Sequence, residues 1–348
     1  MDIFFIGFRD PLFSLIIFFI LIFIITLVSY WWGRYKNQED TKKLDEFLDS
    51  FRQMPTQDEL TDLISSSKIS QKSWLLLAKS YYDYGDYEKS IEIYNELLKV
   101  SSLSNSKDIM FLLGRTYFKA GFLQRSKDIF LTILKDQPKM PQVLEYLLLV
   151  YESLKDYRSA LDVLEPLDEL NQFIQKDMIY LQILLLLDNK KLSEDKKIEQ
   201  LLQIYKKNTQ FQYLIFQYIF QKNPQVAWKN LSFNNLENLI DIFWFLDKKD
   251  LDFDIIAQHP YLQELYSARG DITVVDRSEL FEFDLLIKLQ NKASVTLSFE
   301  YICDNCKQSY PFVFYRCSYC HTLDKMRIEP SLIRDYQRDF NYESNSFQ

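Results

Sequence analysis

Residues 74–85 read Trp-Leu-Leu-Leu-Ala-Lys-Ser-Tyr-Tyr-Asp-Tyr-Gly and begin a pattern that returns further along the chain. Four positions of this pattern recur 36 residues later and again, in a relaxed form, after a further 34 residues. They are Tyr81, Gly85, Ser90 and Tyr94; then Tyr117, Gly121, Ser126 and Phe130; then Tyr151, Lys155, Ala160 and Leu164. Self-similarity at a nearly fixed period of this length predicts a solenoid of stacked helix pairs.

The repeated unit resembles the tetratricopeptide repeat, a helix–turn–helix of 34 residues. Small residues such as Ala78 and Gly114 would let the two helices of a unit approach closely, and Gly85 would end the first helix in the left-handed conformation. Because each unit leaves an apolar face exposed, at least about three repeats are needed for stability. We expect well-formed repeats over residues 71–168, with the Ser-rich stretch 101–106 as a lengthened loop.

Residues 169–290 keep a helical periodicity but depart from the repeat consensus. An apolar stripe at helical spacing illustrates this, formed by Leu236, Leu239, Ile240 and Phe243. Aromatic residues at such spacing mainly predict a core. The segment is therefore expected to hold degenerate helical repeats, and the predicted fold class is mainly α.

The N-terminus is expected to be a transmembrane anchor. Residues 11–33 contain no charged side chain, and a helix of this length, at about 1.5 Å per residue, crosses the roughly 30 Å hydrocarbon layer. A cleaved signal peptide would have a shorter apolar region followed by small residues, whereas this run ends in Tyr-Trp-Trp at 30–32, a pattern typical of a membrane interface. We expect residues 1–33 to form the anchor and residues 34–70 a juxtamembrane tether.

The charges beside the anchor predict its orientation. The first ten residues carry one Arg and two Asp, whereas residues 34–43 carry one Arg and three Lys. By the positive-inside rule, the N-terminus lies outside and residues 34–348 lie in the cytoplasm. Four cysteines close together in a reducing compartment favour metal binding over a disulfide framework.

The composition argues against several functional classes. The chain has only 6 glycines, where average usage would give about 24, so phosphate-binding glycine loops are not expected. The net charge of −8 argues against broad capture of nucleic acid. The two histidines, His259 and His321, lie in no recognisable nucleophile motif. We therefore expect neither an enzyme nor a small-molecule substrate.

The C-terminus carries the most specific chemical signal, two Cys-x2-Cys knuckles. Residues 295–302 alternate in polarity and predict a strand that leads into the first knuckle. Four thiolates at this spacing surround one tetrahedral ion and form a closed structural zinc site. The expected ligands are Cys303, Cys306, Cys317 and Cys320. We expect them to bind zinc, with iron as the alternative, in a module over residues 291–330 that is followed by a tail at 331–348.

Three other interpretations fit parts of this pattern. Cys317-Ser-Tyr-Cys320-His321 matches a c-type haem signature, but this leaves the first knuckle unexplained. A redox Cys-x-x-Cys normally begins a helix in a thioredoxin-like context, which is missing here. A nucleic-acid-binding ribbon is the more serious alternative, since residues 286–327 hold six Lys or Arg and three Asp or Glu. Four thiolates and one Zn²⁺ reduce that excess to about +1, which is weak for binding phosphates.

The order of anchor, tetratricopeptide solenoid and terminal rubredoxin-like knuckle pair resembles the bacterial lipopolysaccharide assembly protein B family. The resemblance covers the whole architecture and is closest over residues 73–168 and 301–330. It includes Leu-Gly-Arg-Thr-Tyr-Phe-Lys-Ala-Gly at 113–121 and Tyr-Arg-Ser-Ala-Leu-Asp-Val-Leu at 157–164. The chain departs from the family pattern in several places: Lys307 replaces the usual glycine, Ser318 replaces the usual proline, the tryptophan that usually follows is absent, and the later repeats have drifted.

This resemblance implies a single-pass regulator of lipopolysaccharide synthesis at the bacterial inner membrane, with a periplasmic N-terminus. Family members are adaptors that help a membrane-bound ATP-dependent metalloprotease to degrade the deacetylase committing precursors to lipid A. Their metal module packs against the solenoid. The hypothesis is therefore a non-enzymatic, membrane-tethered cytoplasmic adaptor that binds protein partners along its solenoid. The alternatives are a general tetratricopeptide scaffold for another envelope complex and a nucleic-acid-binding zinc-ribbon protein.

Overall fold

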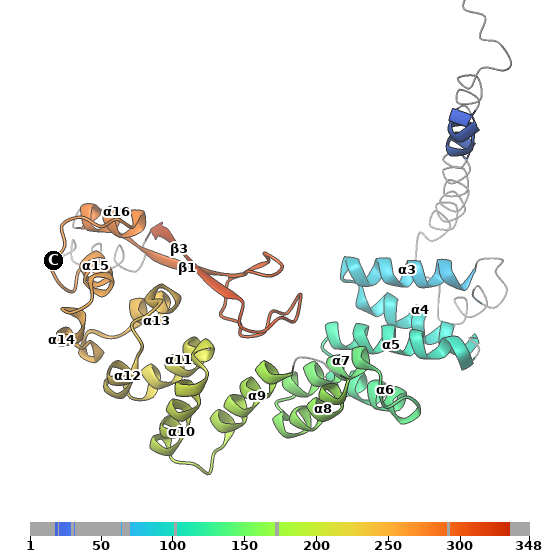
Figure 1. Cartoon of the computed structure of the whole chain (residues 1–348), viewed down its shortest axis with the longest axis horizontal. Helices are drawn as coiled ribbons and strands as arrows, with labels where there is room; N and C mark the ends of the chain where they lie inside the picture. Colours follow the sequence, from blue (N-terminus) through green and yellow to red (C-terminus); the bar gives the residue numbers. More distant parts are fainter. Residues whose placement is uncertain are drawn as a thin grey trace, which may run out of the picture. The chain divides into compact units, whose positions relative to one another are not determined.

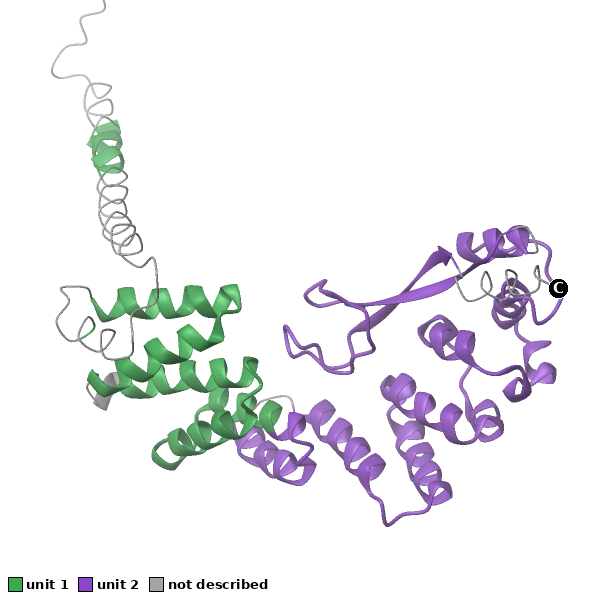
Figure 2. Cartoon of the chain, turned by 180° about the vertical axis from the view of Figure 1, so that it is seen from behind, with its two compact units in different colours: residues 1–150 green, residues 151–348 purple. Residues whose placement is uncertain are grey.

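The structure is a computed structural model of the chain, and it is mainly helical (Figure 1). It describes residues 18–19, 21–28, 31, 64, 70–100, 103–170, 174–290 and 293–334. The chain divides into two compact units, residues 1–150 and residues 151–348 (Figure 2).

The helices of the first unit follow the predicted repeat. They are α3 (Gln71–Tyr84), α4 (Tyr87–Val100), α5 (Leu103–Lys119), α6 (Leu123–Asp136) and α7 (Pro141–Ser153), which extends into the second unit. α3 ends at Gly85, which has a φ of 92° and donates its N–H to the carbonyls of Tyr81 and Tyr82. Gly121 has the same left-handed backbone, with a φ of 82°, and Lys155 adopts it at the equivalent place after α7, with a φ of 59°. The helix–turn–helix prediction is thereby confirmed.

The small residue in α5 brings two backbones close together. Gly114 faces α6, and the buried hydroxyl of Ser126 donates a hydrogen bond of 2.8 Å to the Gly114 carbonyl. A Cβ atom on Gly114 would lie 2.5 Å from the ring of Phe130, which is fully buried. The side chain of any other residue would therefore force this helix pair apart, as the sequence predicted for a small-residue position.

The prediction of a loop at residues 101–106 is wrong for the residues that the structure describes. α5 begins at Leu103, so residues 103–106 are helical. α5 has 17 residues, whereas α3 has 14. The extra residues of the first, 36-residue period therefore lie in a longer helix. Serine is unfavourable inside a helix but favoured at its start, where hydroxyl groups can serve the unpaired N–H groups.

The second unit continues with helices of unequal length. They are α8 (Tyr157–Glu169), α9 (Gln175–Asp188), α10 (Glu194–Lys207), η1 (Thr209–Phe211), α11 (Gln212–Lys222), α12 (Pro224–Asn230), η2 (Leu236–Leu239), α13 (Ile240–Phe245), η3 (Lys248–Asp250), α14 (Phe253–Ile256), α15 (Pro260–Arg269) and α16 (Phe281–Leu289). α9 and α10 have 14 residues each, whereas α14 has four. The predicted apolar stripe over residues 236–243 is buried, although it is divided between η2 and α13.

A small antiparallel sheet follows the helices, with the strand order β2-β1-β3. β1 (Val295–Cys303) confirms the predicted strand, and its residues Leu297, Phe299 and Tyr301 are buried. β2 (Ser309–Tyr310) is short. β3 (Met326–Arg334), which was not predicted, pairs with β1 along its whole length, from Cys303 opposite Met326 to Val295 opposite Arg334. Its charged residues and Pro330 are typical of an edge strand.

The predicted transmembrane anchor lies mostly outside the described residues. Residues 18–19, 21–28 and 31 are helical, and their large apolar side chains are exposed. Within the part of the chain that the structure describes, no helix is both long enough and apolar enough to span a membrane. The predicted tether, residues 34–70, is described only at residues 64 and 70.

Gly114→Ala tests the close packing of α5 on α6. The added methyl group collides with Phe130, and we expect it to lower the free energy of unfolding of the first unit by about 1–3 kcal/mol. Urea denaturation followed by circular dichroism measures the change. In the double variant Gly114→Ala, Phe130→Leu, the smaller side chain should recover part of the loss. Independent, additive effects of the two substitutions would contradict this packing.

Candidate metal centre

The four predicted cysteines come together at the end of the sheet. Cys303 is the last residue of β1, and the other three lie in the turns between β1 and β3. Their Sγ atoms all lie within 4.8 Å of one another. The Sγ atoms of Cys303 and Cys320 are 3.6 Å apart, and so are those of Cys306 and Cys317. None of the four cysteines forms a disulfide.

These distances match a tetrahedral set of sulfur ligands. A Zn–S bond of about 2.3 Å with tetrahedral angles separates two sulfur atoms by about 3.8 Å. The four cysteines are therefore placed to hold one metal ion, with each sulfur of the second knuckle beside a sulfur of the first. That arrangement differs from a haem attachment, in which the second knuckle would act alone. Tetrahedral iron accepts the same four thiolates.

Both knuckles have the same backbone geometry. In the first, the Lys307 N–H donates to the Cys303 carbonyl at 2.7 Å, and the Cys303 N–H donates to the Gln308 carbonyl at 3.0 Å. In the second, the His321 N–H donates to the Cys317 carbonyl at 2.9 Å, and the Cys317 N–H donates to the Thr322 carbonyl at 3.0 Å. Two equivalent turns therefore present two pairs of sulfurs.

Each turn depends on a left-handed residue immediately after its second cysteine. Lys307 has a φ of 62° and His321 a φ of 60°. A residue with a Cβ adopts this conformation at a cost of about 1–2 kcal/mol, which glycine would avoid. His321 therefore has a backbone role in the turn, and among the described residues the metal-ligating cluster is formed by the four cysteines.

Polar groups beside the second knuckle favour thiolates there. The Tyr310 hydroxyl lies 3.2 Å from Cys317 Sγ, and the Thr322 hydroxyl lies 3.4 Å from Cys320 Sγ. Burial raises the pKa of Cys303. Burial also opposes ionisation of Cys320, but hydrogen bonds from Thr322 and Asn305 outweigh it and lower the pKa of Cys320 to about 5. Four thiolates this close repel one another, so a cation is required for all of them to be ionised.

An arginine beside the second knuckle joins it to the helices of the second unit. Arg316 precedes Cys317 and is only 10% exposed. Its guanidinium donates to a carboxylate oxygen of Glu152 and to one of Asp177, both at 2.7 Å. It also lies over the ring of Tyr180, 5.5 Å from the centroid, and Tyr180 donates to Glu152 at 3.2 Å. Burial raises the pKa of Glu152 even though Arg316 opposes this shift.

A buried carboxylate joins the first knuckle to the helices. Asp241 of α13 is 4% exposed and accepts hydrogen bonds from the Tyr301 hydroxyl at 2.8 Å and the Tyr213 hydroxyl at 2.6 Å. The Ile242 N–H donates to its other oxygen at 2.8 Å. Burial raises the pKa of Asp241. Each knuckle thus has a polar anchor within two residues of its first cysteine, Tyr301 for the first and Arg316 for the second.

The sequence analysis missed both anchors. The chain separates Arg316 from Glu152 by 164 residues and Tyr301 from Asp241 by 60 residues. One signal was available for Asp241, since it lies inside the apolar run Leu239-Ile-Asp-Ile-Phe243. A carboxylate on the buried face of such a run needs a partner. For Arg316 no comparable local signal exists.

An arginine packed among aromatic rings forms a second candidate site in the first unit. Arg115 of α5 lies among the rings of Tyr82, Phe111 and Tyr146, with its guanidinium 5.6, 5.8 and 5.3 Å from their centroids. Its buried Nε has no hydrogen-bond partner. Within the described residues, no carboxylate forms an ion pair with it. Tyr82, Arg115 and Tyr146 come from the first helices of three successive helix pairs.

Comparison with known proteins finds a tetratricopeptide repeat in the chain and one kind of similar protein. Residues 71–102 match the family model for the tetratricopeptide repeat. Lipopolysaccharide assembly protein B of Escherichia coli strain K12 is 26% identical to the chain over 132 residues, which cover 37% of this chain and 34% of that protein. The same values hold for the protein of that name from Escherichia coli O157:H7. The chain thus spans about a third of the length of the curated relatives it matches.

Solved repeat proteins are also similar. A tetratricopeptide repeat protein from Parabacteroides merdae is 14% identical, with a TM-score of 0.39, and the match covers 73% of this chain and 98% of that one. MamA from Desulfovibrio magneticus RS-1 is 18% identical, with a TM-score of 0.36, over 46% of this chain and 89% of that one. The chain is a mainly helical tetratricopeptide solenoid with a C-terminal cluster of cysteines.

Cys306→Ser tests metal binding by the four-sulfur cluster. We expect the wild-type full chain, purified in detergent, to hold one metal ion per chain, and the variant to hold well below one, because three sulfurs and a hydroxyl form a weaker site. Elemental analysis measures the content and distinguishes zinc from iron. Gln308→Ala, an exposed position between the knuckles, is the matched control and should keep the metal. Equal metal content in both variants would exclude the site.

Arg316→Ala tests the anchor of the second knuckle. Removing the cation leaves Glu152 and Asp177, whose side chains are only 15% and 21% exposed, without their partner. We expect a loss of about 3 kcal/mol in the free energy of unfolding of the second unit. Arg327→Ala is the control, because Arg327 pairs with Asp304 and Glu329 while remaining 49% exposed. Its loss should stay below about 1 kcal/mol. Urea titration compares the two, and losses of similar size would contradict a buried anchor.

Proposed function

We propose that this chain is a membrane-tethered cytoplasmic adaptor that regulates lipopolysaccharide biosynthesis and has no catalytic activity of its own. The observation that carries the proposal is the similarity to lipopolysaccharide assembly protein B in a chain that also has tetratricopeptide repeats and a four-cysteine cluster. Repeat solenoids provide long surfaces for protein partners. A closed four-thiolate site braces a fold and leaves no open position for catalysis.

In this proposal residues 1–33 span the inner membrane once, residues 34–70 are the tether, and the remainder lies in the cytoplasm. The uncharged run at residues 11–33 and the exposed apolar side chains of the helical residues 18–19 and 21–28 support the anchor. Tethering confines the solenoid to the membrane surface. That raises its effective concentration toward other membrane-bound proteins by removing most of the search volume.

The solenoid would hold the partners and the metal module would brace it. We assign the well-formed repeats to residues 71–168, the degenerate repeats to 169–290 and the zinc module to 291–330, with a tail after it. Zinc bound by the four cysteines would stabilise the knuckles, whose anchors at Arg316 and Asp241 would fix the module on the helices. Iron is the alternative ion.

Arg115 is the proposed contact for a carboxylate of a partner. Three aromatic rings hold its guanidinium in place, and its Nε has no internal acceptor. Arg115 as a whole is only half-buried, and the other N–H groups of its guanidinium would donate charge-assisted hydrogen bonds to a partner carboxylate. The partners implied by the family resemblance are a membrane-bound ATP-dependent protease and the lipid A deacetylase, which the adaptor would bring together so that the deacetylase is degraded.

Depletion of the chain in its native bacterium, followed by complementation, tests this function. We expect depletion to change the level of the lipid A deacetylase and the lipopolysaccharide content, and wild-type complementation to restore both. Arg115→Ala should restore them only partly. Arg125→Ala is the matched control, since Arg125 also lies over aromatic rings, at 5.8 and 5.5 Å, but is exposed, and it should complement fully. Unchanged deacetylase and lipopolysaccharide after depletion would reject the proposal.

Two alternative functions would each give a different experimental result. A general scaffold for another envelope complex would crosslink to proteins of that complex in membranes, without the protease or the deacetylase. A nucleic-acid-binding zinc ribbon would give salt-dependent binding of RNA or DNA to the full chain.

A further inference from the structure

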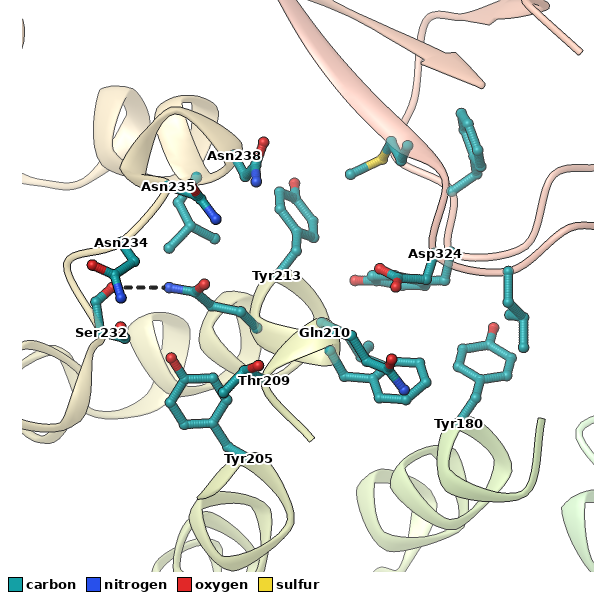
Figure 3. Close-up of a pocket in the computed structure, with 18 residues that line it drawn as sticks. Tyr180, Tyr205, Thr209, Gln210, Tyr213, Ser232, Asn234, Asn235, Asn238 and Asp324 are labelled. Atoms are coloured by element: carbon teal, nitrogen blue, oxygen red, sulfur yellow. Dashed lines mark hydrogen bonds between the residues drawn. The ribbon is translucent and has the colours of Figure 1, made fainter. Parts of the chain in front are cut away.

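A cavity of about 450 Å³ lies inside the second unit, between the helices and the metal module. One side is formed by η1, α11 and residues 232–239, and the other by residues 314–326 of the module (Figure 3). Its volume falls within the range of sites that bind small molecules or short peptides. We call it the amide pocket, after the side chains described next.

Four amide side chains line this pocket without internal partners. They are Gln210, Asn234, Asn235 and Asn238. All four are exposed, and none makes a side-chain hydrogen bond to any part of the chain that the structure describes. The three asparagines lie on one side of the pocket, whereas Asp324 and Tyr180 lie on the other. Gln212 differs, because its amide donates to the Ser232 carbonyl at 3.1 Å and holds the asparagine segment in place.

A buried hydroxyl in the same pocket is also unsatisfied. Tyr205 is only 6% exposed and lines the pocket, yet its hydroxyl has neither a donor nor an acceptor among the described residues. An unpaired buried hydroxyl is costly, and most such groups in folded proteins have a partner. The buried hydroxyl is the group that a ligand would satisfy, and the four exposed amides offer further donors and acceptors to the same ligand.

The charge of the pocket excludes phosphorylated ligands. No Lys or Arg lines it, and its one carboxylate, Asp324, lies 3.7 Å from Lys176. A nucleotide or a phospholipid headgroup would lack a cation for its phosphate. The pocket thus offers no charge to an anion, and its carboxylate is already paired with a lysine, which favours an uncharged ligand.

Two of the aromatic rings that line the pocket pack on each other. Phe211 and Tyr180 stack on each other, with centroids 6.4 Å apart, and they are 4% and 5% exposed. The two ring faces that meet are thus occupied, and both rings are too deeply buried to offer a broad platform for a nucleobase or a sugar. Amide side chains, in contrast, match peptide units, because both present one carbonyl acceptor beside N–H donors. A helix already satisfies its own peptide groups, whereas an extended segment keeps them available.

We propose that the amide pocket binds a short, uncharged, extended segment of a partner protein through the peptide groups of that segment. The inference rests on the proposed adaptor function and specifies where the partner chain is held. The asparagines and Gln210 pair with successive peptide groups, and the Tyr205 hydroxyl accepts or donates one further bond. Because residues 314–326 form one wall, the pocket is complete only when the metal module is docked.

Binding of a defined probe to the full chain in detergent tests the proposal. The probe is a fluorescent, capped hexapeptide pool composed of Ala, Ser, Gly and Asn, and its partner is the same pool with every backbone nitrogen methylated. We expect fluorescence polarisation to detect binding of the first pool and at least tenfold weaker binding of the second, because methylation removes the N–H donors. Equal binding of the two pools, or no binding of either, would overturn the proposal. Binding of maltohexaose or adenosine in place of the peptides would also overturn it.

Substitutions in the pocket locate the binding site. Asn234→Ala with Asn238→Ala should weaken peptide binding at least tenfold, and Tyr205→Phe by about threefold to tenfold, the value of one hydrogen bond. Tyr205→Phe breaks no internal bond, so the fold should be retained. Tyr261→Phe is the matched control, because its hydroxyl is also buried and unpartnered but lies outside this pocket, and binding should not change. If the control and the pocket variants behave alike, the pocket is not the site.

The two proposals fail in distinguishable ways. If the wild-type chain restores deacetylase and lipopolysaccharide levels but no peptide binds, the amide pocket is wrong and the adaptor function stands. If peptides bind with the expected pattern but depletion changes neither level, the pathway is wrong and the pocket stands.

Discussion

The second unit depends on the contact of one buried guanidinium with two carboxylates. Arg316 holds Glu152 and Asp177 while remaining 10% exposed, so little water competes for any of the three charges. Because Arg316 directly precedes Cys317, the same short piece of backbone positions a metal ligand and an ion pair. Neither can be displaced without straining the other, and a local turn is thereby coupled to helices far away in the sequence.

The proposed functions follow from that coupling. A metal ion would set the shape of the knuckles, the knuckles present Arg316 and Tyr301 to the helices, and the docked module closes one wall of the amide pocket. The first unit is simpler, since its helix pairs are held by close backbone contact at Gly114 and by left-handed turns. An adaptor built in this way can have a rigid repeat region and a second region whose integrity depends on a metal.

The sequence predicted the features that depend on short-range spacing. The repeat period, the strand before the first knuckle and the four cysteines all lie within patterns of a few dozen residues. The anchors at Arg316 and Asp241 were not predicted, because their partners are remote in the chain. The chain has 90 charged residues, and the sequence around Arg316 does not distinguish it from the others. Lys307 is instructive in a different way. It adopts the left-handed conformation usually given to glycine, since the spacing of the cysteines leaves the turn no alternative.

The paired strands β1 and β3 have a mechanical consequence. Nine residues each, hydrogen-bonded along their full length, form a ribbon about 30 Å long with the cysteines at one end and α16 beside the other. A two-stranded ribbon of this kind opens most readily from a free end. The chain itself joins β1 to β3 at the end that carries the metal site, and the knuckles keep that connection short and closed. Loss of the ion would turn it into a long open loop and would leave the ribbon without a firm closure at either end.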